Sequence, residues 1–425
     1  MSGANNEKPG TSRRFFLTGA AGLAGAAGVV AAAPSAPAKA TGANGPLEPF
    51  WGAHQSGIIT PAQRHIYFAA FDLLAAKRED VAALMKAWTD AAARMTSGQT
   101  AVELTEDGAN PPADSGETVG LAPLRLTITF GFGPGLFSKD GQDRYGLAGR
   151  RPQALVDLPR FNGDQLVPER TGGDLAIQAC ADDAQVAFHA VRQLARLGDG
   201  VVQIRWAQPG FVGGYAPGET GRNLMGFKDG TMNPLTSDPK LMDQFIWVGD
   251  EGGWMRGGSY MVARPVRIAL EHWDRMKLAF QEQTMGRHKA SGAALGKVKE
   301  FDPIDLDAVD GEGNPVIPEN SHVRLGAPAT NDGTQILRRS YSYDNGLSFV
   351  AERWPPWRQG MELDAGLLFV CYQRDPRTGF VKIFENMAKF DMMNQFATHI
   401  GGGLFACPPG AKKGEYVGQR LFESA

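Results

Sequence analysis

The sequence predicts an α+β fold built from two ferredoxin-like units with antiparallel β-sheets in one chain. The composition is that of a globular protein, with 43% hydrophobic and 21% charged residues among 425. Segments with strand and helix patterns follow one another in the order β-α-β-β-α-β. The same order returns in the second half of the chain, in segments of roughly equal length. These observations together favour a duplicated architecture.

The first unit is predicted to begin with an apolar strand and an amphipathic helix. In that helix Val81, Leu84, Met85, Trp88 and Ala92 recur at three- and four-residue spacing, which places them on one face. A segment with period-two alternation comes next, followed by a short strand, a second helix and a closing strand. The predicted ranges are strand 64–73, helix 78–95, strand 124–130, strand 174–179, helix 182–197 and strand 201–207.

The second unit repeats this order with the same kinds of pattern. Its first strand is followed by a helical stretch, two strands, a second helical stretch and a short strand. The predicted ranges are strand 259–270, helix 271–284, strand 336–343, strand 367–373, helix 380–398 and strand 404–406.

The first forty residues have the pattern of an export signal. Arg13 and Arg14 precede a weakly apolar, Gly-rich stretch over 18–33, and small residues at 38–40 form a cleavage site. Paired arginines before such a stretch are typical of a twin-arginine signal. A membrane-spanning helix is disfavoured because the stretch is short and interrupted by Gly and Pro. We expect 1–40 to be removed and the protein to be exported by the twin-arginine machinery to a secreted, periplasmic or cell-envelope location.

We expect the rest of the chain to divide into an N-terminal unit over 41–235 and a C-terminal unit over 236–425. Two stretches, 139–173 and 286–335, do not fit the strand and helix order and are rich in Gly, Pro and Asp. Long ordered insertions in compact domains are often functional. The search for a site therefore begins in these two insertions.

The charge balance excludes nucleic acid as the main expected partner. The chain has 43 Lys and Arg against 46 Asp and Glu, a formal net charge of −3. Residues 1–40 hold Lys8, Arg13, Arg14 and Lys39 but only Glu7, so the remainder carries 39 basic and 45 acidic residues, about −6. The protein left after cleavage is therefore acidic.

The cysteines and histidines exclude a cysteine metal site and leave one histidine of interest. The three cysteines, Cys180, Cys371 and Cys407, are too far apart for a C-x-x-C pair, and no two of the seven histidines have a short chelating spacing. One imidazole is enough to hold a haem iron, because the porphyrin supplies four nitrogens. His322 ends the second insertion, just before a strand with two arginines. The alternative is a solvated loop histidine.

A tight turn over 223–234 carries a second candidate. Gly226 and Gly230 bracket Phe227-Lys228-Asp229, and Asn233-Pro234 ends the segment. Two glycines allow a sharply bent backbone that closely approaches a flat ligand, with Asp229 projecting from the bend. The alternative is an ordinary Asp-Gly turn.

These segments resemble the motifs of dye-decolourising peroxidases, a haem family. The turn at Gly226–Gly230 resembles the family's G-x-x-D-G signature. Further resemblances lie at 284–292 (G-R-x-K-x-x-G), at Ser321-His322-Val323, at Leu337-Arg338-Arg339 and in the segments 366–375 and 401–405. They cover nearly the whole chain after the signal, and the most similar subgroup is the exported one that includes the bacterial deferrochelatase/peroxidase. Ala293-Ala294 departs from the Ala-Pro often found in that subgroup.

The resemblance implies a fold, a cofactor and a set of site residues. The fold is of the dimeric α+β barrel type, and the cofactor is one haem b per chain, with His322 as its proximal metal ligand. Asp229 and Arg338 are the implied catalytic residues on the distal face. Further expected haem contacts are Gly230, Thr231, Met232, Ala327, Pro328, Ala329, Arg338 and Arg339, the last with a propionate.

The implied activity is peroxidase turnover with hydrogen peroxide and small aromatic reductants, including dyes. A carboxylate as the acid–base group predicts turnover that is best in mildly acidic conditions. Because large dyes do not fit beside a buried haem, surface radicals are expected, with Tyr341, Tyr343, Tyr372, Trp354 and Trp357 as candidates or, alternatively, core aromatics. Two other functions are a haem-handling deferrochelatase and a binding module without catalysis. A homo-oligomer is possible.

Overall fold

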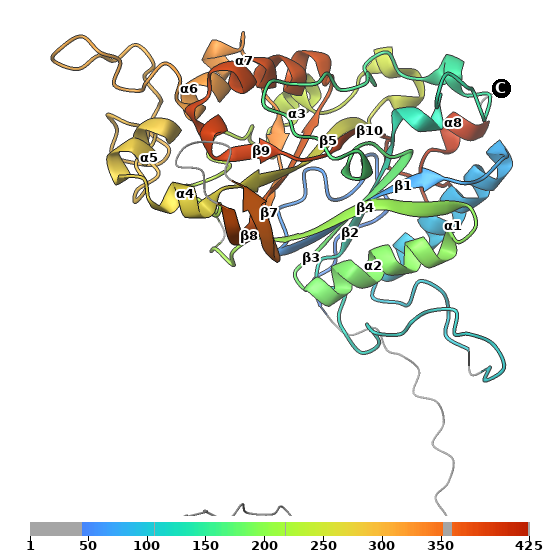
Figure 1. Ribbon diagram of the computed structural model, residues 1–425. Helices are drawn as coiled ribbons and strands as arrows, with labels where there is room; N and C mark the ends of the chain where they lie inside the picture. Colours follow the sequence, from blue (N-terminus) through green and yellow to red (C-terminus); the bar gives the residue numbers. More distant parts are fainter. Residues whose placement is uncertain (1–44, 106, 217, 352–358, 424–425) are drawn as a thin grey trace, which may run out of the picture. The chain divides into compact units, whose positions relative to one another are not determined.

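The computed structural model describes residues 45–423, except 106, 217 and 352–358 (Figure 1). The described part of the chain belongs to one compact unit, Gly42–Ala425. The predicted signal over 1–40, and Trp354 and Trp357, lie outside the described residues. Among the residues that are described, no helix is long and apolar enough to cross a membrane.

The N-terminal half has the predicted ferredoxin-like order. Strand β1 pairs with β3 on one edge and β4 on the other, and β2 pairs with β3, all antiparallel. Helices α1 and α2 pack against one another and cover the same sheet face, with Trp88 donating its indole hydrogen to the Leu194 carbonyl oxygen. The observed bounds are β1 His65–Leu73, α1 Arg78–Thr96, β2 Thr127–Phe132, β3 Leu175–Ala181, α2 Ala184–Leu197 and β4 Val202–Phe211.

The C-terminal half contributes a second antiparallel set of strands. Strand β5 pairs with β8 and β10, β8 also pairs with β6 and β7, and β9 adds to β5. The observed bounds are β5 Ser259–Ile268, α4 Leu270–Asp274, α5 Leu278–Met285, β6 Leu337–Arg338, β7 Tyr341–Ala351, β8 Gln359–Gln373, α7 Lys382–Phe390, β9 Ala397–His399 and β10 Gly403–Cys407.

The strands of the two halves form one sheet that closes on itself. The pairing order runs β8-β7-β4-β1-β3-β2-β10-β5, and β5 pairs back to β8. Large side chains such as Phe68, Trp206, Tyr341, Tyr372 and Phe405 share one core cluster inside this ring. A second core lies between the outer face of the sheet and the helices. The predicted α+β class with antiparallel sheets is confirmed, and the closure agrees with the barrel type.

Several predicted elements of the second half differ in extent. The helix expected over 271–284 is two short helices, α4 and α5, and the helix expected over 380–398 ends at Phe390. There the backbone of Asp391 is extended, and its carboxylate accepts the backbone amide of Met393, which starts a new turn. The strand expected over 336–343 divides into β6 and the start of β7. Three short helices were not predicted: α3 Pro239–Phe245, α6 His322–Gly326 and α8 Gln419–Glu423.

Candidate active site

A mainly apolar cavity lies on the outer face of the sheet in the C-terminal half. Side chains alternate across a strand, so Val266 and Ile268 of β5 and Leu367 and Phe369 of β8 face this cavity, while Leu368 and Val370 face the barrel interior. Helices α6 and α7, which pack against one another, provide another wall. The turn 228–232 also lines the cavity.

His322 lines the cavity as the first residue of α6. Its Nδ1 lies 2.7 Å from Oδ2 of Asp391, so Nδ1–H donates to that carboxylate and Nε2 is the nitrogen left for a metal. Burial by itself would lower the pKa of His322, but the charge and hydrogen bond of Asp391 outweigh it and raise that pKa. Asp391 thus orients the ring and makes the imidazole more basic.

Asp391 was not predicted from the sequence. It lies 69 residues after His322 and meets it only because α7 packs against α6. Its side chain is 2% exposed, and its second oxygen accepts the Met393 amide. The local role of Asp391 is to cap the N-terminus of the short turn Met392–Gln395, which is an ordinary position for an aspartate within a segment where the sequence predicted continuous helix.

Asp229 and Arg338 form an ion pair at the same cavity. Nη1 of Arg338 lies 3.3 Å from Oδ1 of Asp229, and both side chains are about one quarter exposed. Asn233 links the two segments: its Oδ1 accepts the backbone amide of Arg338 at 3.1 Å, and its Nδ2 donates to the Arg338 carbonyl oxygen at 2.8 Å. The ion pair is therefore held by the fold, because Asn233 fastens the 229 turn to β6.

Glu300 of the second insertion supports the same turn. Thr231 donates its hydroxyl to Glu300 Oε1 at 3.0 Å, and Lys228 lies 3.4 Å from Oε2. Burial would raise the pKa of Glu300, but hydrogen bonds from Thr220 and Thr231 and the charge of Lys228 lower it. The insertion 286–335 thus supplies His322, and it also supplies Glu300, which supports the turn that carries Asp229. In contrast, no described residue of the other insertion, 139–173, lines the cavity.

The other predicted contacts divide into two groups. Gly230, Thr231, Met232 and Pro328 line the cavity, and their contact with a haem stays a prediction. Gly230 has φ +110, a conformation that a side chain would strain. Ala327 is buried beneath the cavity wall and Ala329 is exposed on another surface, so neither lines the cavity.

The expected contact of Arg339 with the cofactor is wrong. Arg338 faces the cavity, and adjacent strand residues point to opposite faces, so Arg339 points into the barrel. There its guanidinium is buried and donates to the Thr60 carbonyl oxygen and to the side chain of Gln63. The Leu-Arg-Arg pattern alone did not separate the two arginines.

The tyrosines proposed as surface radical carriers are core residues. Tyr341, Tyr343 and Tyr372 are fully buried in the barrel interior. Burial raises the pKa of each phenol well above its ordinary value. The alternative reading of these three residues as core aromatics is the one that the structure supports.

The residues around the cavity fit a haem. A flat, apolar macrocycle suits walls made by Val266, Ile268, Leu367 and Phe369. His322 offers a neutral ring nitrogen whose tautomer is set by Asp391, which is the usual arrangement of a metal-binding histidine. Arg338 and Asp229 line the same cavity and are able to act on a small ligand there.

Comparisons with known proteins agree with this site. The family model for the Dyp-type peroxidase N-terminal part matches residues 55–212, and the C-terminal model matches residues 220–412. The chain is 38% identical over 388 residues to a dye-decolorizing peroxidase of Thermobifida fusca (strain YX), covering 87% of this chain and 84% of the relative. It is 37% identical over 390 residues to a deferrochelatase of Escherichia coli (strain K12), covering 89% of this chain and 88% of the relative.

A solved structure shows the same arrangement of the chain. The structure of ferric DtpA from Streptomyces lividans superposes with a TM-score of 0.79 at 40% sequence identity, covering 92% of this chain and 100% of that one. Both family models, together covering most of the chain, and relatives above one third identity lead to one conclusion. The chain belongs to the Dyp-type peroxidase family and is a haem peroxidase.

Proposed function

We propose that this enzyme uses hydrogen peroxide to oxidise dyes and other small aromatic reductants on one haem b held by His322. The observation that carries the proposal is that two residue pairs line one apolar cavity. His322 is hydrogen-bonded to Asp391, and Asp229 forms an ion pair with Arg338. The first pair suits metal binding and the second suits acid–base work.

The side chains of the chain have distinct parts in peroxide activation. Bound haem would supply the ferric iron and the electrons needed to split the O–O bond. Asp229 takes the proton from one peroxide oxygen and returns it to the other. Arg338 pairs with the Asp229 carboxylate and stabilises negative charge on the departing oxygen. Asn233 holds Asp229 and Arg338 next to one another by its hydrogen bonds to the Arg338 backbone. The apolar walls limit the amount of water in the cavity.

The haem-handling alternative is favoured by the names of several relatives. The relatives include proteins called deferrochelatase as well as dye-decolorizing peroxidase. In that function the same cavity would bind haem and release its iron without peroxide turnover. Both functions need His322 to hold the haem, but only peroxide turnover needs Arg338 and Asp229 to activate peroxide.

One experiment separates the two functions. Haem-loaded protein is given peroxide and an anionic dye across pH 3–8, and free porphyrin and iron are measured in the same samples. We expect multiple turnovers per haem, fastest in mildly acidic conditions, with the porphyrin remaining metallated. Release of iron and metal-free porphyrin without dye turnover would support the deferrochelatase function instead, and an optimum well above neutrality would contradict Asp229 as the base.

We propose further that residues 1–40 direct export by the twin-arginine pathway. The support is the arginine pair before a weakly apolar, Gly-rich stretch and a small-residue cleavage site. Replacing Arg13 and Arg14 by lysine should leave uncleaved, haem-loaded protein in the cytoplasm. Normal cleavage and export of this variant would contradict the proposal.

Replacing Asp391 by asparagine should weaken haem retention by about 10- to 100-fold. Asparagine still accepts the His322 hydrogen bond, but the negative charge that makes the imidazole basic is lost. The measurement is the rate of haem transfer to an excess of apomyoglobin. Asp332→Asn is the matched control, because Asp332 pairs with Lys382 on the surface; an equal rate in both variants would contradict the role of Asp391.

Replacing Glu300 by glutamine should reduce the loss of thermal stability that the protein shows as the pH falls into the acid range. The pKa of Glu300 is lowered in the folded protein, so its carboxylate adds stability above its ordinary pKa of 4.5 and loses it as the pH falls through the lowered value. We expect the wild-type unfolding temperature to fall more steeply than that of Glu300→Gln between about pH 5 and pH 3. The measurement is thermal unfolding across this pH range. If the unfolding temperatures of the wild type and Glu300→Gln fell in parallel, the Glu300 carboxylate would not contribute to stability.

A further inference from the structure

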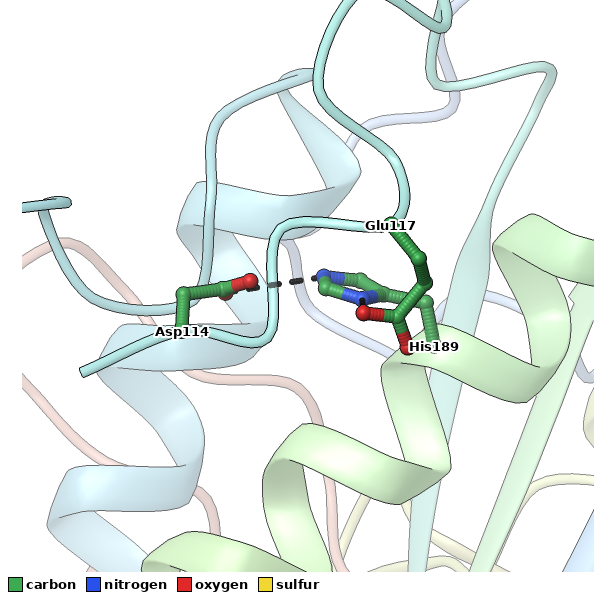
Figure 2. A group of neighbouring side chains, drawn as sticks. All are labelled: Asp114, Glu117 and His189. Carbon is green, nitrogen blue, oxygen red and sulfur yellow. Dashed lines mark ion pairs between the residues drawn. The ribbon is translucent and has the colours of Figure 1, made fainter. Parts of the chain in front are cut away.

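A second cluster of ionisable side chains lies in the N-terminal half. Asp114 and Glu117 come from the loop between α1 and β2, and His189 comes from α2. Figure 2 shows the imidazole between the two carboxylates, with one ring nitrogen toward each. One ligand atom from each residue lies within 4.8 Å of the others. None of the three lines the haem cavity.

Both ring nitrogens of His189 are buried without a hydrogen bond. Nε2 lies 3.5 Å from Asp114 Oδ2, and Nδ1 lies 3.2 Å from Glu117 Oε2. Charge-assisted hydrogen bonds are shorter, at about 2.7–2.9 Å. Two ligand atoms bound to one zinc ion by bonds of about 2.0–2.2 Å lie about 3.4 Å apart. The 3.5 Å between Nε2 and Asp114 Oδ2 is therefore the separation of neighbouring metal ligands, whereas Glu117 lies on the Nδ1 side of the ring.

The carboxylates of the cluster also favour the binding of a cation. The Asp114 side chain is fully buried, and its oxygens accept the backbone amides of Ala101 and Gly116. Among the ion pairs of the described residues, its only basic partner is His189. Glu117 accepts a hydrogen bond from Ser115 and pairs with Nη1 of Arg192 at 3.1 Å. The buried carboxylate of Asp114 thus has one imidazole as its counterpart, and a buried negative charge is costly without a compensating cation.

We infer that Asp114, Glu117 and His189 form a binding site for a divalent transition-metal ion of the zinc type. Nitrogen and carboxylate ligands suit Zn²⁺, whereas Ca²⁺ and Mg²⁺ prefer oxygen ligands throughout and are not suited to an imidazole nitrogen. His189 Nε2 binds the ion with Asp114, and Glu117 completes the set when its side chain turns from the Nδ1 side of the ring toward Asp114. Water fills the fourth position.

The groups around the cluster match the outer shell of a metal site. The backbone amides of Ala101 and Gly116 hold the Asp114 carboxylate, and the Ser115 hydroxyl donates to Glu117 and accepts from Gln193 of α2. Such partners orient metal-binding carboxylates. The ion fastens the loop over 97–126 to α2. Among the described residues of this loop there is no helix or strand, so the bound ion acts as its structural tie.

The test measures zinc on the haem-loaded protein. After treatment with a chelator, the protein is titrated with Zn²⁺ by calorimetry, and its zinc content is measured by mass spectrometry. We expect one Zn²⁺ per chain in addition to the haem iron, and zinc-dependent protection of residues 98–118 from hydrogen exchange. Asp114→Asn and His189→Gln should each abolish stoichiometric binding, with an unchanged Soret band as the check that the fold is intact.

Two further variants keep the test decisive. Glu117→Gln alters the most exposed ligand, with a side chain 20% exposed, and should weaken Zn²⁺ binding at least about 10-fold even if the other variants fold poorly. His288→Gln is the matched control, because His288 forms an isolated pair with Glu282 at 3.0 Å. Absence of stoichiometric zinc in the wild type, or equal zinc in His189→Gln, would overturn the proposal. A loop whose protection follows imidazole protonation instead of zinc would identify the cation as a proton.

Discussion

Replacing Arg338 by leucine should slow the reaction with peroxide by about 100- to 1,000-fold while haem stays bound. The guanidinium lies 3.3 Å from Asp229 and lines the cavity, so its loss removes the positive charge that stabilises the departing oxygen. The hydrogen bond between His322 and Asp391 does not involve Arg338 and should be kept. The measurement is the stopped-flow change of the Soret band after one equivalent of peroxide.

Two companion variants make the Arg338 result specific. Arg338→Lys keeps the charge but loses the planar fork, and should fall between the wild type and the leucine variant. Arg377→Leu removes an arginine that pairs with Asp375 on the surface, and should react like the wild type. A leucine variant at position 338 that reacts at the wild-type rate would remove Arg338 from the catalytic residues.

Replacing Asp229 by asparagine should slow the same reaction by about 100- to 10,000-fold, with the largest deficit in mildly acidic conditions. Asparagine keeps the shape of the side chain but cannot take a proton from peroxide. Haem content should not change, because the ion pair of Asp229 is with Arg338 and the hydrogen bond of His322 is with Asp391. The measurement is the second-order rate constant for peroxide across pH 4–8.

The Asp229 variant also has a surface control and a paired test. Asp375→Asn alters the matched surface ion pair and should leave the rate constant unchanged. Because Asp229 and Arg338 are in contact, the double variant should lose less than the product of the two single effects. Full additivity, or an unchanged pH profile in Asp229→Asn, would mean that a group other than Asp229 moves the proton.

The repeated order of strands and helices could be predicted because it depends on the spacing of apolar residues that are close together in the sequence. Period-two alternation and three- to four-residue spacing lie within short windows, and β1, α1, α2 and β10 follow their predicted ranges closely. Element ends in the second half could not be predicted in the same way. The end of α7 depends on Asp391, whose place is decided by packing against α6.

The site was predicted in part for the same reason. Asp229, His322 and Arg338 lie in recognisable segments, and the structure brings all three to one cavity. Asp391 and Asn233 act across 69 and 105 residues of chain, and a pattern read along the sequence carries no signal of such contacts. The Asp114, Glu117 and His189 cluster likewise joins a loop to a helix that follows it by about 70 residues.

The sequence by itself determined the fold class and the family and predicted three residues that line the cavity, because these depend on residue type and local spacing. Only the tertiary structure decided which arginine of the pair at 338 and 339 faces the cavity. Both have the same chemistry, and strand alternation sends one to the cavity and the other into the barrel once the register of β6 against β8 is set. The structure also supplied the partner of His322, since a hydrogen bond between distant segments exists only after the helices that carry them have packed.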